Sequence, residues 1–337
     1  MDLSELRERA NWTRYRPGQG AGHYESFFLR ANHPSRPQAF WIRYTLFSPD
    51  RRPEAAIGEL WAVAFDGETG RHHAAKSEFP IAACAFGADR FAVRIAEAHL
   101  DAGHLTGAAG DGATPIGWDL RFHSDAQPLF LLAPGLYSAR LPRAKSLVGL
   151  PLAVFDGALR IGEQRIDVRG WVGSQNHNWG SRHTDAYAWG QVAGFDSHPD
   201  SFLEIGTARL KFGPLWTPNM TVLVLRHGTR EIALNTLGQS LRARGAFRCF
   251  DWTFRSENSE VAVEGRISAP RESFVGLRYY NPPGGVKWCL NSKLAACEVR
   301  VTDKRVAASS PEVLRTAHRA AFEILTDDTA HGVPISA

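Results

Sequence analysis

Hydrophobic and polar residues alternate along much of this chain with a period of two. The clearest alternating segments are residues 91–96, 116–123 and 250–254. Successive side chains of a β-strand point to opposite faces, so this period predicts strands with one buried and one exposed face. Turn residues such as Asp66-Gly67 and His227-Gly228 separate the segments. Many short strands between turns predict an all-β protein built as a sandwich or a barrel.

Two further segments are apolar on both faces. Residues 40–47 read FWIRYTLF, and residues 60–65 read LWAVAF. A strand of this kind lies between two layers, lies in a barrel that contacts a second barrel, or forms a barrel wall around an apolar lumen.

Helical patterns are scarce. Residues 3–10 predict one short helix. Near the C-terminus, Ser310 suits an N-cap and Pro311 suits the first turn. The apolar residues that follow at helical spacing are Leu314, Ala317, Ala321 and Leu325. We therefore expect a short C-terminal helix packed on the outside of a sheet.

The length of the chain suggests two domains. Its 337 residues exceed the size of about 250–300 residues at which single cores stop growing. The turn at Asp156-Gly157 and the break at Arg169-Gly170 place the boundary between them. We expect an N-terminal barrel over residues 12–165 and a C-terminal barrel over residues 166–327.

Composition narrows the range of partners. Hydrophobic residues make up 44% and charged residues 22%, which is ordinary for a soluble globular protein. The net charge of +4 is scattered, so we expect no nucleic-acid partner. No apolar run is long enough to span a bilayer, and no secretory signal is recognisable. The four cysteines form no C-x-x-C pair, which favours buried, reduced thiols. We expect a cytoplasmic protein with at most transient membrane contact.

The segment Arg169–Phe195 concentrates polar and aromatic side chains. It reads RGWVGSQNHNWGSRHTDAYAWGQVAGF. Buried Trp, Tyr, His and Asn side chains all need hydrogen-bond partners. The segment is therefore either a tight hairpin corner with aromatic plugs or the wall of a functional site. The residues that would line one mainly apolar cavity there are Trp41, His177, Trp179, Tyr187 and Trp189. His177 could position a substrate or pass a proton, or it could be a core histidine bonded to backbone.

Three acids could take part in proton transfer. Glu204 interrupts the apolar stretch SFLEIG. Inside a barrel, desolvation would raise its pKa and make it a usable acid; outside, it would pair with an arginine such as Arg209. Glu25 stands similarly at the start of an apolar strand. Asp185 lies in an expected loop, where capping a turn is its favoured role.

Metal and nucleotide motifs are missing from the sequence. His72-His73, His177, His183 and His198 have neither helical H-x-x-x-H spacing nor a cysteine partner, so we expect no metal site. There is no G-x-S-x-G, no G-x-G-x-x-G that opens a helix and no Walker loop. We therefore expect no serine nucleophile and no cofactor.

The block His177-Asn178-Trp179-Gly180, followed by Tyr187-Ala188-Trp189-Gly190, resembles the signature of the lipocalin-like hydroxyneurosporene synthase (carotenoid 1,2-hydratase) superfamily. Supporting similarities are YESFF at 24–28, FWIRY at 40–44 and IGELWA at 57–62. The resemblance spans roughly residues 20–300, and related proteins include tocopherol cyclase and lipocalin-like Diels–Alderases. It implies two tandem lipocalin-like (calycin) antiparallel β-barrels, with a ligand pocket at or near their junction.

Carotenoid hydratases pair a His-x-Trp with a downstream Tyr-x-Asp, whose acid protonates an alkene. Here His177-x-Trp179 matches, and the nearest equivalent of the second motif is Phe202-Leu203-Glu204. The tyrosine hydroxyl is lost, which argues against carotene hydration itself. The resemblance implies Glu204 as the acid, His177 as an orienting or relaying group and Trp179 as a stabiliser of positive charge. The residues expected to contact the ligand are Glu25, Trp41, Asn178, Tyr187, Trp189 and Phe202.

Two functions follow from these residues. The first is an enzyme that hydrates, cyclises or isomerises an apolar molecule such as an isoprenoid, polyene or lipid. The second is a binding protein that shields such a ligand without chemistry. A weaker third reading is a stress-related protein whose pocket has decayed. Fold resemblance alone does not decide among them.

Overall fold

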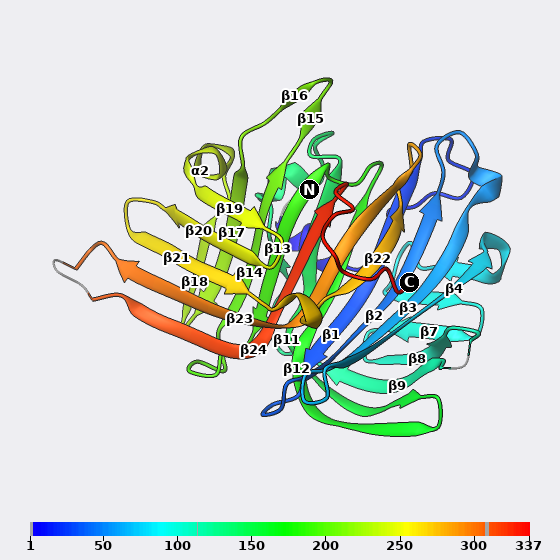
Figure 1. The fold of residues 1–337 in the computed structure, drawn as a ribbon. Coiled ribbons are helices and arrows are strands. Elements are labelled where there is room, and N and C mark those ends of the chain that lie inside the picture. The colour runs from blue at the N-terminus through cyan, green and yellow to red at the C-terminus, as the bar shows by residue number, and fades with distance from the viewer. Residues whose placement is uncertain (1–2, 113, 307–309) are drawn as a thin grey trace.

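The computed structural model describes residues 3–112, 114–306 and 310–337. Two curled β-sheets lie side by side, the first blue to green and the second green to red in Figure 1. The first sheet contains β1 (His23–Asn32), β2 (Gln38–Ser48), β3 (Ile57–Asp66), β4 (Arg71–Pro80), β5 (Cys84–Phe86), β6 (Ala92–Ile95), β7 (Ala98–Asp101), β8 (His104–Ala109), β9 (Ile116–His123), β10 (Leu129–Phe130), β11 (Ala144–Ile161) and β12 (Gln164–Gly180). The second contains β13 (Ala186–Ala193), β14 (Phe202–Arg209), β17 (Met220–His227), β18 (Arg230–Leu234), β19 (Arg244–Arg248), β20 (Asp251–Glu257), β21 (Val261–Ser268), β22 (Val275–Tyr280), β23 (Val286–Asp303) and β24 (Glu312–Thr326).

The remaining elements are small. They are the strands β15 (Lys211–Phe212) and β16 (Leu215–Trp216), the helices α1 (Leu3–Glu8) and α2 (Leu237–Arg242), and 3-10 turns at Pro53–Ala55, Ile81–Ala83, Pro134–Tyr137 and Arg271–Ser273. Helix α1 agrees with the short helix expected over residues 3–10. None of the helices in the described residues is both long and apolar enough to cross a membrane.

Strand order explains how two cores and a junction arise. The first sheet runs β4-β3-β2-β1-β12-β11-β9-β8-β7-β6-β5, and the second runs β18-β17-β14-β13-β24-β23-β21-β20-β19, with antiparallel neighbours throughout. On β1, Phe27 and Leu29 point into the core of the first sheet. The alternate residues Phe28 and Arg30 instead contact side chains of the second sheet. Strand β1 is therefore buried on both faces. The two antiparallel, barrel-like sheets confirm the all-β prediction.

The change of sheet falls later than the expected boundary at residue 165. Strands β11 and β12 form one long hairpin of the first sheet, and the second sheet begins at β13. Asp156-Gly157 is a bulge within this hairpin, since the register shifts between Phe155 and Gly157. The carboxylate of Asp156 accepts a 2.8 Å hydrogen bond from the backbone N–H of Gly170 across the hairpin. Gly157 and Gly170, which suggested a domain boundary, therefore lie at one bulge between paired strands.

The prediction of a C-terminal helix over residues 310–325 is wrong. Residues Glu312–Thr326 form β24, which is hydrogen-bonded to β13 on one side and β23 on the other. Ala320, Phe322 and Ile324 face the core of the second sheet, whereas Ala321 and Leu325 face the junction. Because residues 319–325 are all buried, the apolar residues of this part satisfy a helical spacing as well as a strand spacing, whereas Ala317, expected on the buried helix face, is exposed.

The bulge at Gly157 supplies a test of this hairpin. Gly157 has φ +136°, and a Cβ there would lie 2.2 Å from the backbone oxygen of Asp119. We expect Gly157→Ala to lower the free energy of unfolding by about 3 kcal/mol, because both strain and a backbone clash are introduced. Gly162→Ala, at φ +57° with nothing within 4 Å, should lower it by only about 1 kcal/mol. Urea unfolding measures both, and equal losses would contradict this account of the bulge.

Candidate functional site

Glu204 is a buried carboxyl group at the junction of the two sheets. Only 1% of its surface is exposed. Its Oε1 accepts a 2.7 Å hydrogen bond from the Trp189 indole, and its Oε2 accepts one of 2.8 Å from Gln191 Nε2. Burial raises the pKa of Glu204 to about 7, although these two hydrogen bonds and the charge of Arg30 lower it. It does not pair with Arg209, the partner considered for an outward-facing side chain.

Gln191 connects this acid to the first sheet. Its Oε1 accepts hydrogen bonds from Arg30 Nε at 2.8 Å and from Ser174 Oγ at 2.6 Å. Its Nε2 donates to Asn176 Oδ1 at 2.7 Å as well as to Glu204. Arg30, Ser174 and Asn176 come from β1 and β12, and Gln191 comes from β13. One amide therefore joins side chains of both sheets.

An aromatic region lies beside this network. The Lys293 ammonium lies 5.8 Å from the ring centroid of Trp41 and 5.6 Å from that of Trp189. Lys293 donates a 2.7 Å hydrogen bond to Glu323, forming an ion pair in which the lysine has no exposed surface. Burial lowers the pKa of Lys293, and the charge of Glu323 opposes that change. The expected ligand residues Trp41 and Trp189 are therefore brought together, and they share one cation.

Arg43 adds a second buried cation to the same region. Its guanidinium lies 4.3 Å from the ring centroid of Tyr279 and donates to Ser26 Oγ at 2.6 Å. The buried polar atoms without a hydrogen-bond partner in the described part of the chain include Trp41 Nε1, Arg43 Nε and Asn178 Oδ1. Asn178 is paired in register with Ser26 on the neighbouring strand. Buried polar atoms are nearly always satisfied, so these three remain available to a further polar group, as do the other atoms of this kind elsewhere in the described residues.

We call the following residues the junction layer: Arg30, Trp41, Arg43, Trp189, Glu204, Tyr279, Lys293 and Glu323. Tyr187 packs against the same aromatic cluster, and burial raises its pKa well above 10. Phe202 packs instead with Leu129 and Val148 in a separate aliphatic cluster. Tyr187 therefore lies beside the junction layer, whereas Phe202 packs apart from it.

Glu25 and His177 form a second buried group, away from Trp41 and Trp189. Glu25 accepts hydrogen bonds from the Thr13 hydroxyl and from the backbone N–H groups of Arg14 and Tyr15. The two nitrogens of His177 face Glu25 Oε1 at 2.8 Å and the Ala10 carbonyl at 2.6 Å. Both of these partners accept hydrogen bonds, so the geometry suits an imidazolium with two N–H donors. The pair fastens the N-terminal segment to the first sheet.

Charge and stacking complete this second group. Burial by itself would raise the pKa of Glu25, but hydrogen bonds and charge from His177 and His23 hold it well below its usual range. His177 stacks on Phe27 at 4.2 Å and lies 4.7 Å from the ring of Trp179. Trp179 belongs to an apolar cluster beneath helix α1. The structure thus places His177, Trp179 and Glu25 together, but apart from the apolar cluster that contains Trp41 and Trp189.

The indoles expected to stabilise a developing cation already have protein cations beside them. Arg14 lies 5.0 Å from the ring centroid of Trp179. Trp41 and Trp189 share Lys293. A second positive charge on these rings would be repelled by the first. The role in stabilising positive charge that the resemblance implied for Trp179 therefore does not fit this arrangement.

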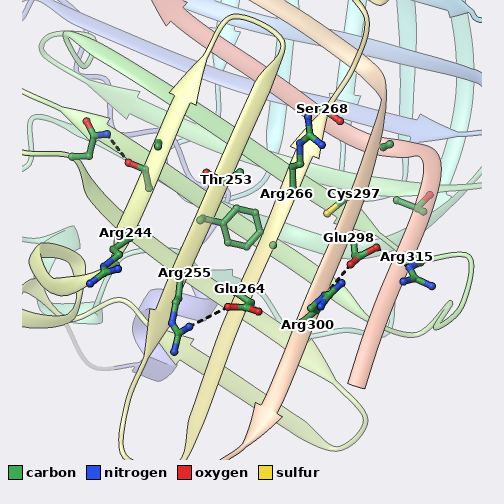
Figure 2. Close-up of a pocket in the computed structure, with 18 of the residues that line it drawn as sticks. Arg244, Thr253, Arg255, Glu264, Arg266, Ser268, Cys297, Glu298, Arg300 and Arg315 are labelled. Atoms are coloured by element: carbon green, nitrogen blue, oxygen red, sulfur yellow. Dashed lines mark hydrogen bonds and ion pairs between the residues drawn. The ribbon is translucent and has the colours of Figure 1, made fainter. Parts of the chain in front are cut away.

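A large cavity lies elsewhere, over β19, β20, β21, β23 and β24. It has a volume of about 1110 Å³ and an open, charged lining. Figure 2 shows Arg255 paired with Glu264, and Arg300 paired with Glu298. None of the expected site residues lines it. Its paired charges make it a poor site for an apolar ligand.

Sequence analysis missed the charged members of the junction layer other than Glu204. Arg30, Arg43 and Glu323 interrupt the apolar runs FFLRA, FWIRYTLF and AAFEILT, whereas Lys293 follows two polar residues in LNSKLAA. The interruption of an apolar run is the signal that singled out Glu204, so it could have identified the first three of these residues. Asp185, by contrast, is paired with Arg182 and accepts from the backbone of Lys211, which fits its favoured role in a loop.

Comparison with known proteins gives relatives but no family. No family model matches the chain. Two uncharacterized proteins of Mycobacterium tuberculosis, MT0513 of strain CDC 1551 / Oshkosh and Rv0493c of strain H37Rv, are each 25% identical to it over 284 residues. The match covers 83% of this chain and 82% of each relative.

Solved structures with the same fold include one protein whose name states an activity, kievitone hydratase. An AttH-like protein of Nitrosomonas europaea superposes with a TM-score of 0.53 at 12% identity, over 94% of this chain and 96% of its own. Kievitone hydratase of Nectria haematococca superposes with a TM-score of 0.53 at 11% identity, over 96% of this chain and 92% of its own. CghA superposes with a TM-score of 0.56 at 11% identity, over 94% of this chain and 93% of its own. These likenesses confirm the lipocalin-like fold, and at such identities they show the fold alone.

If the Glu25–His177 pair fastens the N-terminal segment to the first sheet, breaking the pair should destabilise the protein and expose that segment. Removing one member of a buried ion pair leaves the other uncompensated, so Glu25→Gln should lower the free energy of unfolding by about 3 kcal/mol near pH 7. Because the folded-state pKa of Glu25 is lowered, wild type should lose this advantage as the pH falls below about 4.

Trypsin should also cleave the variant faster after Arg9 and Arg14. Glu68→Gln, which breaks the exposed pair with Arg36, should change stability by less than about 1 kcal/mol. Unchanged trypsin sensitivity in Glu25→Gln would refute the fastening role.

Proposed function

We propose that this protein binds an apolar small molecule, isoprenoid, polyene or lipid-like, beside the junction layer, and that Glu204 protonates it during hydration, cyclisation or isomerisation. The observation that carries the proposal is a buried carboxyl group whose pKa is raised to about 7, next to a mainly aromatic region. The fold shared with kievitone hydratase supports hydration among these reactions.

Glu204 has the protonation behaviour that an acid catalyst needs. With a pKa of about 7, about half of the carboxyl groups are neutral at pH 7. A general acid is most effective when its pKa lies near the operating pH. The Trp189 indole orients one carboxyl oxygen, and Gln191 orients the other. A ligand that takes the place of one of these donors would receive the proton of Glu204.

Arg43 supports a more specific substrate class. Its guanidinium has a free Nε atom among the described residues and lies 6.0 Å from the ring centroid of Trp41. A carbonyl or carboxylate oxygen on an otherwise apolar molecule would satisfy this donor and the indole N–H of Trp41. We infer a substrate with one oxygen-bearing end and an apolar body.

Binding without catalysis is the alternative. Both oxygens of Glu204 already accept hydrogen bonds, and this closed network favours a structural carboxyl group. In that case Trp41, Tyr187 and Tyr279 would shield a ligand, and Glu204 would only help to hold the two sheets together.

Glu204→Gln distinguishes the two functions. The ligand is first sought by native mass spectrometry of the untagged protein and then used as substrate. Glu204→Gln keeps the size of the side chain but removes the acid, so turnover should fall by about 10²–10⁴-fold while the ligand still binds. Wild-type turnover should decline as the pH rises above about 7, because Glu204 loses its proton there.

Glu298→Gln, in the open charged cavity, is the matched control and should keep full turnover. If Glu204→Gln is folded and turns over substrate at the wild-type rate, Glu204 is not the acid. If wild type binds the ligand and never converts it, the protein is a binder.

Replacing Asn178 or Asn32 by leucine tests the binding region, because the two substitutions should affect stability differently. Asn178 Oδ1 is unpartnered in the described residues, whereas Asn32 accepts from Arg30 and donates to the Lys293 carbonyl. Asn178→Leu should leave stability unchanged or raise it by up to about 1 kcal/mol, yet weaken ligand binding. Asn32→Leu should lower stability by about 2–3 kcal/mol. Thermal melts and calorimetric titration measure both, and full ligand affinity in Asn178→Leu would exclude Asn178 from the site.

A further inference from the structure

Three side chains far apart in sequence meet at one edge of the second sheet. His198 lies in the turn between β13 and β14, His227 ends β17, and Glu312 begins β24. The Nε2 atoms of the two histidines lie 3.1 Å and 2.9 Å from the two oxygens of Glu312. The ligand atoms of all three residues fall within 4.8 Å of one another. This donor set lies outside the junction layer and has no part in the proposed function.

Serine hydroxyls orient both imidazole rings. Ser197 Oγ lies 2.8 Å from His198 Nδ1, and Ser201 Oγ lies 2.8 Å from His227 Nδ1. Each ring therefore directs Nε2 toward the shared carboxylate. Histidines that bind metals are commonly fixed in this way through their second nitrogen, which sets the tautomer and the orientation of the ring.

The backbone around His198 is also held in place. His198 exchanges backbone hydrogen bonds with Phe195 in both directions, and its carbonyl accepts from Ser201 N–H. Ser197 Oγ accepts from the backbone N–H of Arg315 on β24. The turn that carries His198 is thus fastened to the strand that carries Glu312, so little rearrangement is needed for the three ligands to converge.

We propose that His198, His227 and Glu312 bind a divalent transition-metal ion, with Zn²⁺ the best match to two imidazoles and one carboxylate. Zn–N and Zn–O distances of about 2.0–2.2 Å in a tetrahedron place neighbouring ligand atoms about 3.3 Å apart, close to the two N–O separations of 3.1 Å and 2.9 Å at this site. The ion binds each neutral imidazole through Nε2, the ring proton then lies on Nδ1 beside the serine oxygen, and water completes the coordination. The ion would tie the start of β24 to the turn between β13 and β14.

The expectation of no metal site rested on short spacings along the chain. These three ligands come from separate segments, and antiparallel pairing brings them together only in the folded sheet. The alternative is a pair of ordinary histidine–carboxylate ion pairs, which would have the same geometry without affinity for a metal.

Zn²⁺ titration of untagged, EDTA-treated protein tests the site. Calorimetry should show about one ion bound per chain, with a dissociation constant on the order of 1 µM or tighter, and Zn²⁺ should raise the melting temperature. His198→Ala and His227→Ala should each weaken binding by about 100-fold or more, and Ser201→Ala by about 10-fold. His104→Ala removes the histidine of an exposed pair with Asp119 and should bind Zn²⁺ like wild type.

Co²⁺ gives a second readout that needs no variant. Four-coordinate Co²⁺ bound by nitrogen and oxygen should give the intense visible absorption of a tetrahedral site, and Zn²⁺ should remove it. Failure of wild type to bind Zn²⁺ stoichiometrically would overturn the proposal. Equal Zn²⁺ affinity in the folded His198→Ala/His227→Ala double variant would overturn it as well.

Discussion

The burial of Arg30 between the two sheets is the constraint on which the junction depends. Its side chain has no exposed surface, and desolvation lowers its pKa to about 9, so it remains a cation near pH 7. A buried cation without partners is destabilising by several kcal/mol. Arg30 finds its acceptors on Asn32 of its own strand and on the other sheet, at the side chain and backbone of Gln191. These bonds fix how the sheets lie against each other, and they turn the amide of Gln191 toward Glu204.

Much of the fold could be predicted because strand alternation is local. The strand at 116–123 could be predicted from its own residues alone, since one of its faces packs in the core and the other faces solvent. The boundary and the C-terminal element could not be obtained in this way. Gly157 resembles a turn residue until β9 and β12 are seen on either side of its strand. Residues 319–325 of β24 are covered by the core of the second sheet on one face and by the junction on the other, and a strand buried on both faces loses the period that identifies it.

The candidate site could be predicted only in part, for a related reason. Glu204 stood out because an acid is rare in an apolar strand. The segment Arg169–Phe195 suggested a single site because its polar and aromatic residues are dense in sequence. In the structure its first part belongs to β12 and its last part to β13, which lie in different sheets. Trp179 therefore packs beneath the N-terminal helix, and Trp189 packs at the junction.

The charges of the junction layer limit the chemistry that it could support. Arg30, Arg43 and Lys293 face the carboxyl groups of Glu59, Glu204 and Glu323, and burial raises the pKa of Glu59 and of Glu204, which is neutral for part of the time near pH 7. A substrate cation about 6 Å from one of these cations would be repelled by about 3 kcal/mol at an effective dielectric constant of 20. The cation–π interaction with an indole face would stabilise the substrate cation by only about 0.5–2 kcal/mol. Repulsion is therefore the larger effect, and a free carbocation is disfavoured. Negative charge that develops on a substrate oxygen near Arg43, while Glu204 supplies the proton to carbon or oxygen, is stabilised by the same charges. If the junction layer is an active site, polarisation of a carbonyl group suits it better than protonation of an isolated alkene.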